Sequence, residues 1–332
     1  RASPVGAGRG SQRVLGSRQL FENFRRTYQG AVFWEADGRE SSVALLDTDG
    51  FAFAVSGKVD GHTVGDLPTT VMSGLIGASM HPNPRLGFVI GLGTGSTAGW
   101  LAKVPTMERV DVVEFEPAIR RVAEVSGPVN EDMLSNPKVR LLYGDGREVL
   151  MTSDDHYDVV FSEPSNPYRA GIASLYSQDF YRSAVTKMTD RGVFVQWVQT
   201  YEIDALTIKT AIATMKTVFP LVEIWTTKFG SDILLVGFKS DAPYSLAEME
   251  TRAQQYPYRE GLEAAWGVSG LGGMLSGFIA GGAATEVIAD QYRDFVDTDD
   301  SPLLEFGVSS TVARAGLGAS RVEIVAVAQQ YG

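Results

Sequence analysis

Residues 88–99 read Phe-Val-Ile-Gly-Leu-Gly-Thr-Gly-Ser-Thr-Ala-Gly, and this stretch decides the fold. Three apolar, strand-forming residues lead directly into glycines at positions 91, 93, 95 and 99. Because glycine lacks a Cβ atom, the backbone there comes close to a ligand, and the helix that follows offers N–H groups at its start. The stretch predicts a strand, a nucleotide-binding turn and a helix, although a tight strand–helix turn without a ligand has the same pattern.

Apolar strands alternate with helices on both sides of this stretch. Strands are expected at 86–90, 110–114, 139–143, 157–161, 192–198, 221–226 and 232–238, and helices at 67–80, 117–125, 177–189 and 205–218. This alternation predicts an α/β, Rossmann-like fold with a mostly parallel, doubly wound sheet. Three β-rich runs at 29–36, 41–46 and 51–56, separated by Asp-Gly turns, predict a small N-terminal antiparallel β-domain.

The domain organisation follows from these patterns. We expect a flexible tail at 1–18, a β-meander domain at 19–66, a Rossmann-like catalytic domain at 67–240 and a helical and loop-rich extension at 241–332. The stretch 264–285 carries no charge but is rich in glycine. It therefore favours a buried glycine-rich helix pair or loop over a membrane span.

Composition excludes several classes of function. The net charge of -11 argues against nucleic acid as the main partner and is compatible with a small cationic ligand, which an acidic pocket would favour. The chain has no cysteine, which excludes disulfides, thiolate metal sites and cysteine nucleophiles. Its three histidines, His62, His81 and His156, have no ligand-like spacing, so no metal is expected.

Two acidic residues stand where the ligands of a nucleotide are expected. Glu114 ends the second strand, where a carboxylate accepts both hydroxyl groups of a ribose. Asp145 lies between Gly144 and Gly146 after the third strand, where it would accept a hydrogen bond from an adenine amino group. Each is explained alone by a solvated strand end or a common turn, but the ordered set fits the crevice of an open α/β sheet.

Several segments resemble one known family in order and spacing. They are His81–Arg85, the glycine loop, Val113–Glu116, Gly144–Gly146 and Tyr157–Pro167, and together they resemble the spermidine synthase (polyamine aminopropyltransferase) family. The segments Ser162–Pro167, Phe194–Gln199 and Thr298–Glu305 are similar to a spermidine synthase-like branch often fused to membrane transporters.

The resemblance implies a nucleotide site and a cellular setting. S-adenosylmethionine, or its decarboxylated form, would be the co-substrate, with no metal. The residues that would bind it are Gly91, Gly93, Thr94, Gly95, Glu114, Asp145 and Gly146. The family also implies a homodimer and a cytoplasmic location, here as the soluble domain of a membrane protein or beside a membrane domain in the full-length protein.

The chain departs from the family pattern at the acceptor side of the site. Thr94 replaces an Asp that pairs with the donor's amine in the family, and Asn166 replaces the catalytic Asp before Pro167. Thr70 and Phe229 stand near positions where the family has Tyr, and Asp60 stands near its Gln. Glu163 matches the family's other acidic position. We therefore expect Glu163, Asn166 and Tyr168 to be catalytic and Asp60, Asp66 and Gln196 to bind the substrate.

Four functions stay open at this point. The first is an aminopropyl-type transferase that acts on a small molecule, such as an amine, and releases 5'-methylthioadenosine. The second is an enzyme that cyclises S-adenosylmethionine without an external amine, which Thr94 would tolerate because it does not repel the donor's carboxylate. The third is a non-catalytic nucleotide-sensing domain, and the fourth is a methyltransferase.

Overall fold

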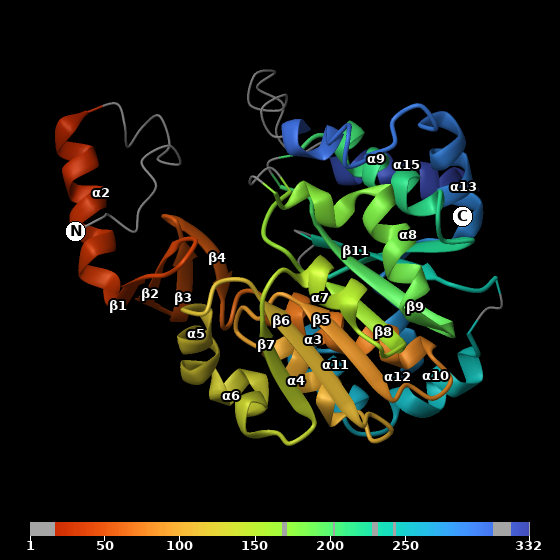
Figure 1. The fold of residues 1–332 in the computed structure, drawn as a ribbon, viewed down its shortest axis with the longest axis horizontal. Helices are drawn as coiled ribbons and strands as arrows, with labels where there is room; N and C mark the ends of the chain where they lie inside the picture. Colours follow the sequence, from red (N-terminus) through yellow and green to blue (C-terminus); the bar gives the residue numbers. More distant parts are fainter. Residues whose placement is uncertain are drawn as a thin grey trace.

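The computed structural model describes residues 17–167, 171–201, 203–227, 232–241, 244–307 and 320–331. Within them lie two sheets, a four-stranded antiparallel one and an eight-stranded mixed one (Figure 1). The large sheet is mostly parallel in its central part and is covered by helices on both faces. The expected α/β class with a small N-terminal antiparallel sheet is therefore confirmed.

Helix α2 (Arg18–Ala31) precedes the small sheet, where the sequence predicts the end of a tail and a strand from position 29. That prediction was wrong for Arg18 and for residues 29–31, which belong to this helix, and no helix or strand was predicted for 19–28. Ser17 caps the helix by accepting a hydrogen bond from the Leu20 N–H at 3.1 Å. The apolar residues at 20, 21, 24 and 28 follow a helical period, which a search for strand-forming residues overlooks.

The small sheet contains four strands in chain order. They are β1 (Val32–Asp37), β2 (Ser42–Thr48), β3 (Gly50–Val55) and β4 (Lys58–His62). Strand β4 was not predicted, because its charged residues and Gly61 give it little β propensity of its own. Pairing with β3 stabilises it.

The large sheet has the order β12-β10-β11-β9-β8-β5-β6-β7. Its strands are β5 (Leu86–Ile90), β6 (Arg109–Glu114), β7 (Val139–Tyr143), β8 (Tyr157–Ser162), β9 (Met188–Gln199), β10 (Leu221–Thr226), β11 (Asp232–Phe238) and β12 (Phe278–Ala280). Strands β5 to β9 pair in parallel, whereas β11, β10 and β12 pair antiparallel. The chain order switches direction between β8 and β5, which is where open α/β sheets bind ligands.

Helices cover the two faces of this sheet and create two apolar cores. One face carries α3 (Leu67–Met80), α4 (Ser96–Lys103), α5 (Ile119–Val125), α10 (Leu246–Ala253), α11 (Tyr258–Trp266) and α12 (Gly270–Leu275). The other face carries α7 (Gly146–Thr152), α8 (Gln178–Thr186), α9 (Ala205–Lys216), α13 (Gly282–Gln291) and α15 (Ser320–Tyr331). The short elements are α6 (Gly127–Asn130), η2 (Met133–Ser135), η3 (Ala173–Tyr176) and η4 (Leu303–Phe306).

The uncharged stretch 264–285 is divided among several elements. It holds the end of α11, helix α12, the edge strand β12 and the start of α13. Across the described ranges, no helix combines the length and the apolar character needed to cross a bilayer.

Candidate active site

The register of three parallel strands places the predicted nucleotide ligands at one level of the sheet. Ile90 of β5 pairs with Val113 of β6 and with Ser162 of β8. The next residue along each strand is therefore Gly91, Glu114 or Glu163, so all three emerge together at the carboxyl edge of the sheet. The sequence alone did not supply this alignment.

The glycine loop requires glycine for two physical reasons. Gly91 has a φ of 95° and Gly95 a φ of 81°, in the left-handed region that other residues rarely adopt. A Cβ atom on Gly91 would also lie 2.4 Å from the carbonyl oxygen of Glu163. The loop therefore passes directly against the loop that follows β8, and α4 begins at its end.

Glu114 is held in place beside the glycine loop. Its Oε2 accepts a hydrogen bond from the Leu92 N–H at 2.9 Å, and its Oε1 accepts one from the Glu116 N–H at 2.8 Å. Burial raises the pKa of this carboxyl group, and the two backbone N–H donors partly oppose the rise. The carboxylate is thus fixed at the strand end where a ribose is expected.

Asp145 is the N-cap of α7. Its Oδ1 accepts hydrogen bonds from the backbone N–H groups of Arg147, at 2.8 Å, and Glu148, at 3.1 Å. Both bonds use the same oxygen, so the helix cap does not require Oδ2. A Cβ on Gly146 would lie 2.5 Å from Cγ2 of Ile90, which explains the glycine there and ties the turn to the end of β5.

Glu163 follows β8 and faces α4. Its Oε2 accepts a hydrogen bond from Oγ1 of Thr97 at 3.0 Å, and its backbone N–H donates to the carbonyl of Ile90. The side chain keeps some contact with solvent, but protein atoms surround it densely. Desolvation, together with the negative charges of Asp232 and Asp66, raises the pKa of Glu163 to about 8, although the hydrogen bond from Thr97 partly opposes the rise.

Two further carboxylates lie near Glu163 at the start of α3. Asp66 precedes α3, its Oδ2 accepts a hydrogen bond from the His62 N–H at 2.7 Å, and burial raises its pKa. Asp232 begins β11, and its Oδ2 accepts a hydrogen bond from Oγ1 of Thr69 at 2.8 Å. Asp232 was missed in the sequence, because the antiparallel direction of β11 brings the start of that strand to the carboxyl end of β9.

Asp60 joins the small sheet to the loop after β8. Its Oδ2 accepts a hydrogen bond from Oγ of Ser165 at 3.1 Å, and Nζ of Lys58 lies 3.5 Å from its Oδ1. The structure therefore brings Asp60, Asp66 and Glu163 to one region. Their role on the acceptor side stays a prediction.

Two other predicted residues, Gln196 and Asn166, are buried. Gln196 is fully buried in β9, and its Nε2 donates to the carbonyls of Ser162 and Trp197, contacts that favour a structural role. Tyr168 and Phe229 lie outside the described residues.

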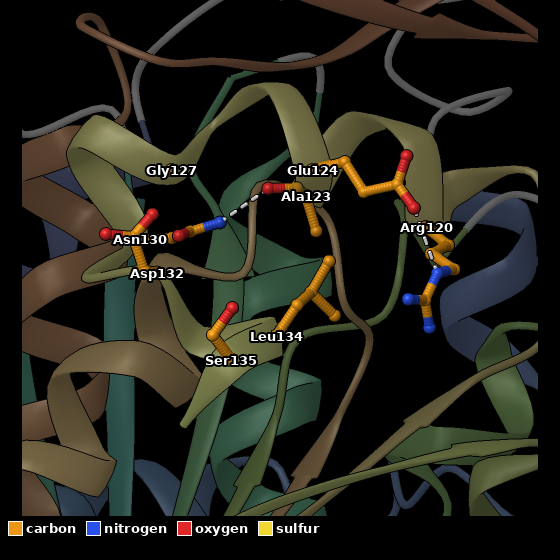
Figure 2. A pocket seen from close by; sticks show the side chains of 8 residues that line it. All are labelled: Arg120, Ala123, Glu124, Gly127, Asn130, Asp132, Leu134 and Ser135. Carbon is orange, nitrogen blue, oxygen red and sulfur yellow. Dashed lines mark hydrogen bonds and ion pairs between the residues drawn. The ribbon is translucent and has the colours of Figure 1, made fainter. Parts of the chain in front are cut away.

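Thr94 is buried within the glycine loop. Its Oγ1 lies 3.0 Å from Oγ of Ser96, and its carbonyl accepts a hydrogen bond from Nδ2 of Asn130 at 2.7 Å. Asn130 also donates to the carbonyl of Ala123 and lines a cavity of about 270 Å³ (Figure 2). The other residues around this cavity are Arg120, Glu124, Gly127, Asp132, Leu134 and Ser135. None of them was predicted to bind a ligand. The cavity lies next to Asn130, whose side chain supports the glycine loop through the carbonyl of Thr94.

Phe115 is a further candidate that the sequence reasoning missed. Its side chain is 55% exposed, although Glu114 and Glu116 on either side of it are held by hydrogen bonds. A large exposed aromatic ring at a fixed position on the ligand-binding edge is suited to cover a flat base. Its apolar character just after a strand end was the available signal.

The part of the chain that the structure describes has no group of three or more histidine or acidic residues arranged to hold a metal ion.

Comparison with known proteins agrees with this geometry. Residues 70–229 match the family model described as the spermine/spermidine synthase domain. The region 70–229, just under half of the chain, is similar to this synthase domain. The matched region contains the glycine loop, Glu114, Asp145 and Glu163, so the resemblance expected from the sequence is confirmed over these residues.

Curated relatives bear one enzyme name. A polyamine aminopropyltransferase from Alkaliphilus metalliredigens is 28% identical over 178 residues, which are 52% of this chain and 62% of that protein. A polyamine aminopropyltransferase from Thermococcus kodakarensis is 28% identical over 245 residues, which are 70% of this chain and 80% of that protein. The match thus spans less than two thirds of the first relative's length.

Solved structures agree on the fold. Spermidine synthase from Thermotoga maritima has a TM-score of 0.58 at 16% identity, covering 68% of this chain and 79% of that one. A spermidine synthase in complex with the transition-state analogue AdoDATO gives the same TM-score and identity, covering 68% of this chain and 78% of that one. These likenesses support the Rossmann-like architecture of this chain.

Proposed function

We propose that this chain is an aminopropyl-type transferase that uses S-adenosylmethionine or its decarboxylated form and releases 5'-methylthioadenosine. The observation that carries the proposal is the position of Glu163. Its backbone carbonyl lies against Gly91 of the glycine loop, and its carboxylate accepts a hydrogen bond from Thr97 and is close to two further carboxylates. The names of the curated relatives support the same reaction.

The nucleoside would lie along the carboxyl edge of β5, β6 and β7. The glycine loop at Gly91, Gly93 and Gly95 would admit the ribose and the sulfonium group. Glu114 would accept the ribose hydroxyl groups, because both of its oxygens are held at the strand end by backbone donors. Oδ2 of Asp145 would accept a hydrogen bond from the adenine amino group, and the ring of Phe115 would cover the base.

The transfer itself needs a nucleophile in line with an activated carbon. The acceptor nitrogen attacks the carbon bound to the sulfonium, the C–S bond breaks, and its electron pair stays on sulfur, which leaves as the neutral thioether 5'-methylthioadenosine. Before this attack, Glu163 takes a proton from the bound ammonium group, which frees the lone pair of the nitrogen. Its raised pKa of about 8 makes its ionised form a stronger base than an ordinary carboxylate.

Glu163, Asp66 and Asp232 together favour a protonated amine as acceptor. Their carboxyl groups are desolvated or mutually repelled, and a bound ammonium group would relieve that repulsion. These three carboxyl groups would compensate for the loss of a base at Asn166. That residue stands where the family has its catalytic Asp, and its amide cannot take a proton as a base. Homodimer formation, membrane association and a cytoplasmic location stay predictions.

Thr94 supports a second candidate reaction. Its hydroxyl group contacts that of Ser96. With threonine at this position, the described loop 91–95 presents no acidic side chain to the donor. The carboxylate of intact S-adenosylmethionine would meet no repulsion there. Attack by that carboxylate on its own activated carbon would close a lactone and release 5'-methylthioadenosine without an amine.

Nucleotide binding tests the part that both reactions share. We expect 5'-methylthioadenosine to bind the protein in a calorimetric titration, and Glu114→Ala to weaken binding roughly tenfold or more through loss of charged hydrogen bonds to the ribose. Glu114→Gln, which keeps an acceptor oxygen and the shape of the side chain, should lose less. Absence of binding to the unaltered protein would overturn the proposal.

A further inference from the structure

The turn at Thr298–Ser301, far along the chain, reaches the start of α7. Asp299 in this turn accepts two hydrogen bonds from one guanidinium group, from Nη1 of Arg147 at 2.8 Å and from Nη2 at 2.6 Å. Its Oδ1 also accepts a hydrogen bond from Oγ of Ser177, the N-cap of α8, at 2.7 Å. This parallel two-bond geometry is stronger and more directional than an ordinary surface ion pair.

The turn is fixed before it meets Arg147. The buried Asp297 donates its N–H to Oγ1 of Thr214 at 2.9 Å, and its carbonyl accepts from the Gln178 N–H at 2.8 Å. Its Oδ1 accepts from the Leu304 N–H at 2.9 Å. The N–H of Asp299 itself donates to Oδ2 of Asp179. The carboxylate of Asp299 is therefore presented from a preorganised turn.

Arg147 is placed to compete with the adenine amino group for the carboxylate of Asp145. It follows Asp145 by two residues in the same first turn, and its own N–H binds Oδ1 of Asp145. The hydrogen bonds that Arg147 donates to Asp299 are the main reason that the pKa of Arg147 is raised, and the charges of Asp299, Asp179 and Asp145 add to the rise. The guanidinium thus lies within the field of Asp145 and would be attracted to it if Asp299 did not hold it.

We propose that Asp299 is a positioning residue: by holding the guanidinium of Arg147 away from Asp145, it keeps the Asp145 carboxylate available to the adenine amino group. The inference rests on the proposed function, because it takes Asp145 as the adenine ligand. It gives the C-terminal segment a part in nucleotide binding that does not require contact with the nucleotide.

A set of three variants tests this competition. Asp299→Asn removes the charge and one acceptor oxygen at nearly constant size, and should weaken 5'-methylthioadenosine binding in calorimetry by roughly three- to tenfold, the worth of one hydrogen bond. Arg147→Met removes the competitor and should bind within about twofold of the unaltered protein. The double variant should bind like Arg147→Met, so the second substitution restores what the first one lost.

A second ligand makes the test specific for the amino group. The purine riboside analogue of 5'-methylthioadenosine lacks only the 6-amino group, so Asp299→Asn should leave its affinity within about twofold. Glu108→Gln is the matched control, because Glu108 forms an exposed ion pair with Arg85 on the surface. That variant should bind both ligands normally.

Each other result overturns the inference. Equal weakening by Arg147→Met and Asp299→Asn would mean that the pair only supports the fold, as would an equal loss for both ligands or a double variant that is not restored. Unchanged binding in Asp299→Asn would show that no competition exists. If the unaltered protein does not bind 5'-methylthioadenosine, the proposed function itself fails, which is a different outcome.

Discussion

At the scale of single residues, the proposed transfer depends on one carboxyl group. Glu163 lies one residue beyond a strand whose register with β5 places it against Gly91, and Thr97 fixes one of its oxygens. The fold brings the neighbouring carboxylates to Glu163 from distant parts of the chain, because Asp66 precedes α3 and Asp232 begins β11. This combination makes Glu163 the base of the proposed transfer.

Replacing Glu163 by Gln should abolish transfer and spare nucleotide binding. Gln keeps an acceptor for the Thr97 hydroxyl group but cannot take a proton, so we expect kcat to fall by roughly 10²–10⁴-fold. The affinity for 5'-methylthioadenosine should change by less than about threefold. Steady-state kinetics and calorimetry on the same preparation check both, and full turnover would remove Glu163 from the mechanism.

The same carboxyl group should make stability depend on pH. Its pKa rises from an ordinary value of 4.5 to about 8 on folding, so the folded protein holds this proton more tightly than the unfolded chain. Stability should therefore fall as pH rises from about 4.5 to 8, by an amount on the order of 2–4 kcal/mol. Glu163→Gln lacks this cost.

Urea unfolding of the two proteins measures the difference. Glu163→Gln should be more stable than the unaltered protein at pH 9 and nearly equal to it at pH 4. A constant difference across this range would mean that the carboxyl group ionises normally in the folded state. The rise in turnover of the unaltered protein should be centred on the same pH of about 8.

At the scale of elements, the glycine loop is constrained by both conformation and space. Alanine at Gly91 would combine a φ of 95° with a contact of 2.4 Å to the Glu163 carbonyl oxygen. Alanine at Gly93 would meet only strain, because its φ is 49° and its nearest neighbour would lie at 3.7 Å. The two positions therefore separate the two constraints.

We expect Gly91→Ala to destabilise the protein by several kcal/mol and Gly93→Ala by about 1 kcal/mol. The backbone carbonyl that opposes Gly91 cannot rotate away, whereas strain at Gly93 is limited to one residue. Thermal unfolding of both variants provides the measurement. Equal losses would show that the loop does not pack tightly against the segment after β8.

The sequence predicted the elements whose patterns are local. The apolar runs at 86–90, 139–143, 221–226 and 232–238 are strands with those bounds, and the helix at 67–80 also begins and ends as expected. Strands β4 and β12 escaped notice because pairing partners stabilise them, not their own residues. Asp232 and Asp299 escaped for a related reason: the residues they meet, Thr69 and Arg147, are 163 and 152 positions away.

At the scale of the whole molecule, separate parts of the chain converge on one edge of the sheet. The hairpin between β1 and β2 is held by Glu116, whose Oε2 accepts from the Glu40 and Ser41 N–H groups. Strand β4 contributes Asp60 to the loop after β8. An overall charge of -11 adds a field that draws cations toward the molecule. This arrangement suits a neutral nucleoside product and a cationic acceptor.

The most direct test of the proposed transfer is mass spectrometry of the products. The protein is incubated with S-adenosylmethionine or its decarboxylated form, each with and without putrescine. Our account predicts 5'-methylthioadenosine together with an alkylated amine, in equal amounts and only when the amine is present. Release of 5'-methylthioadenosine without an amine would favour the cyclising reaction, and intact donor in every mixture would contradict the proposed transfer.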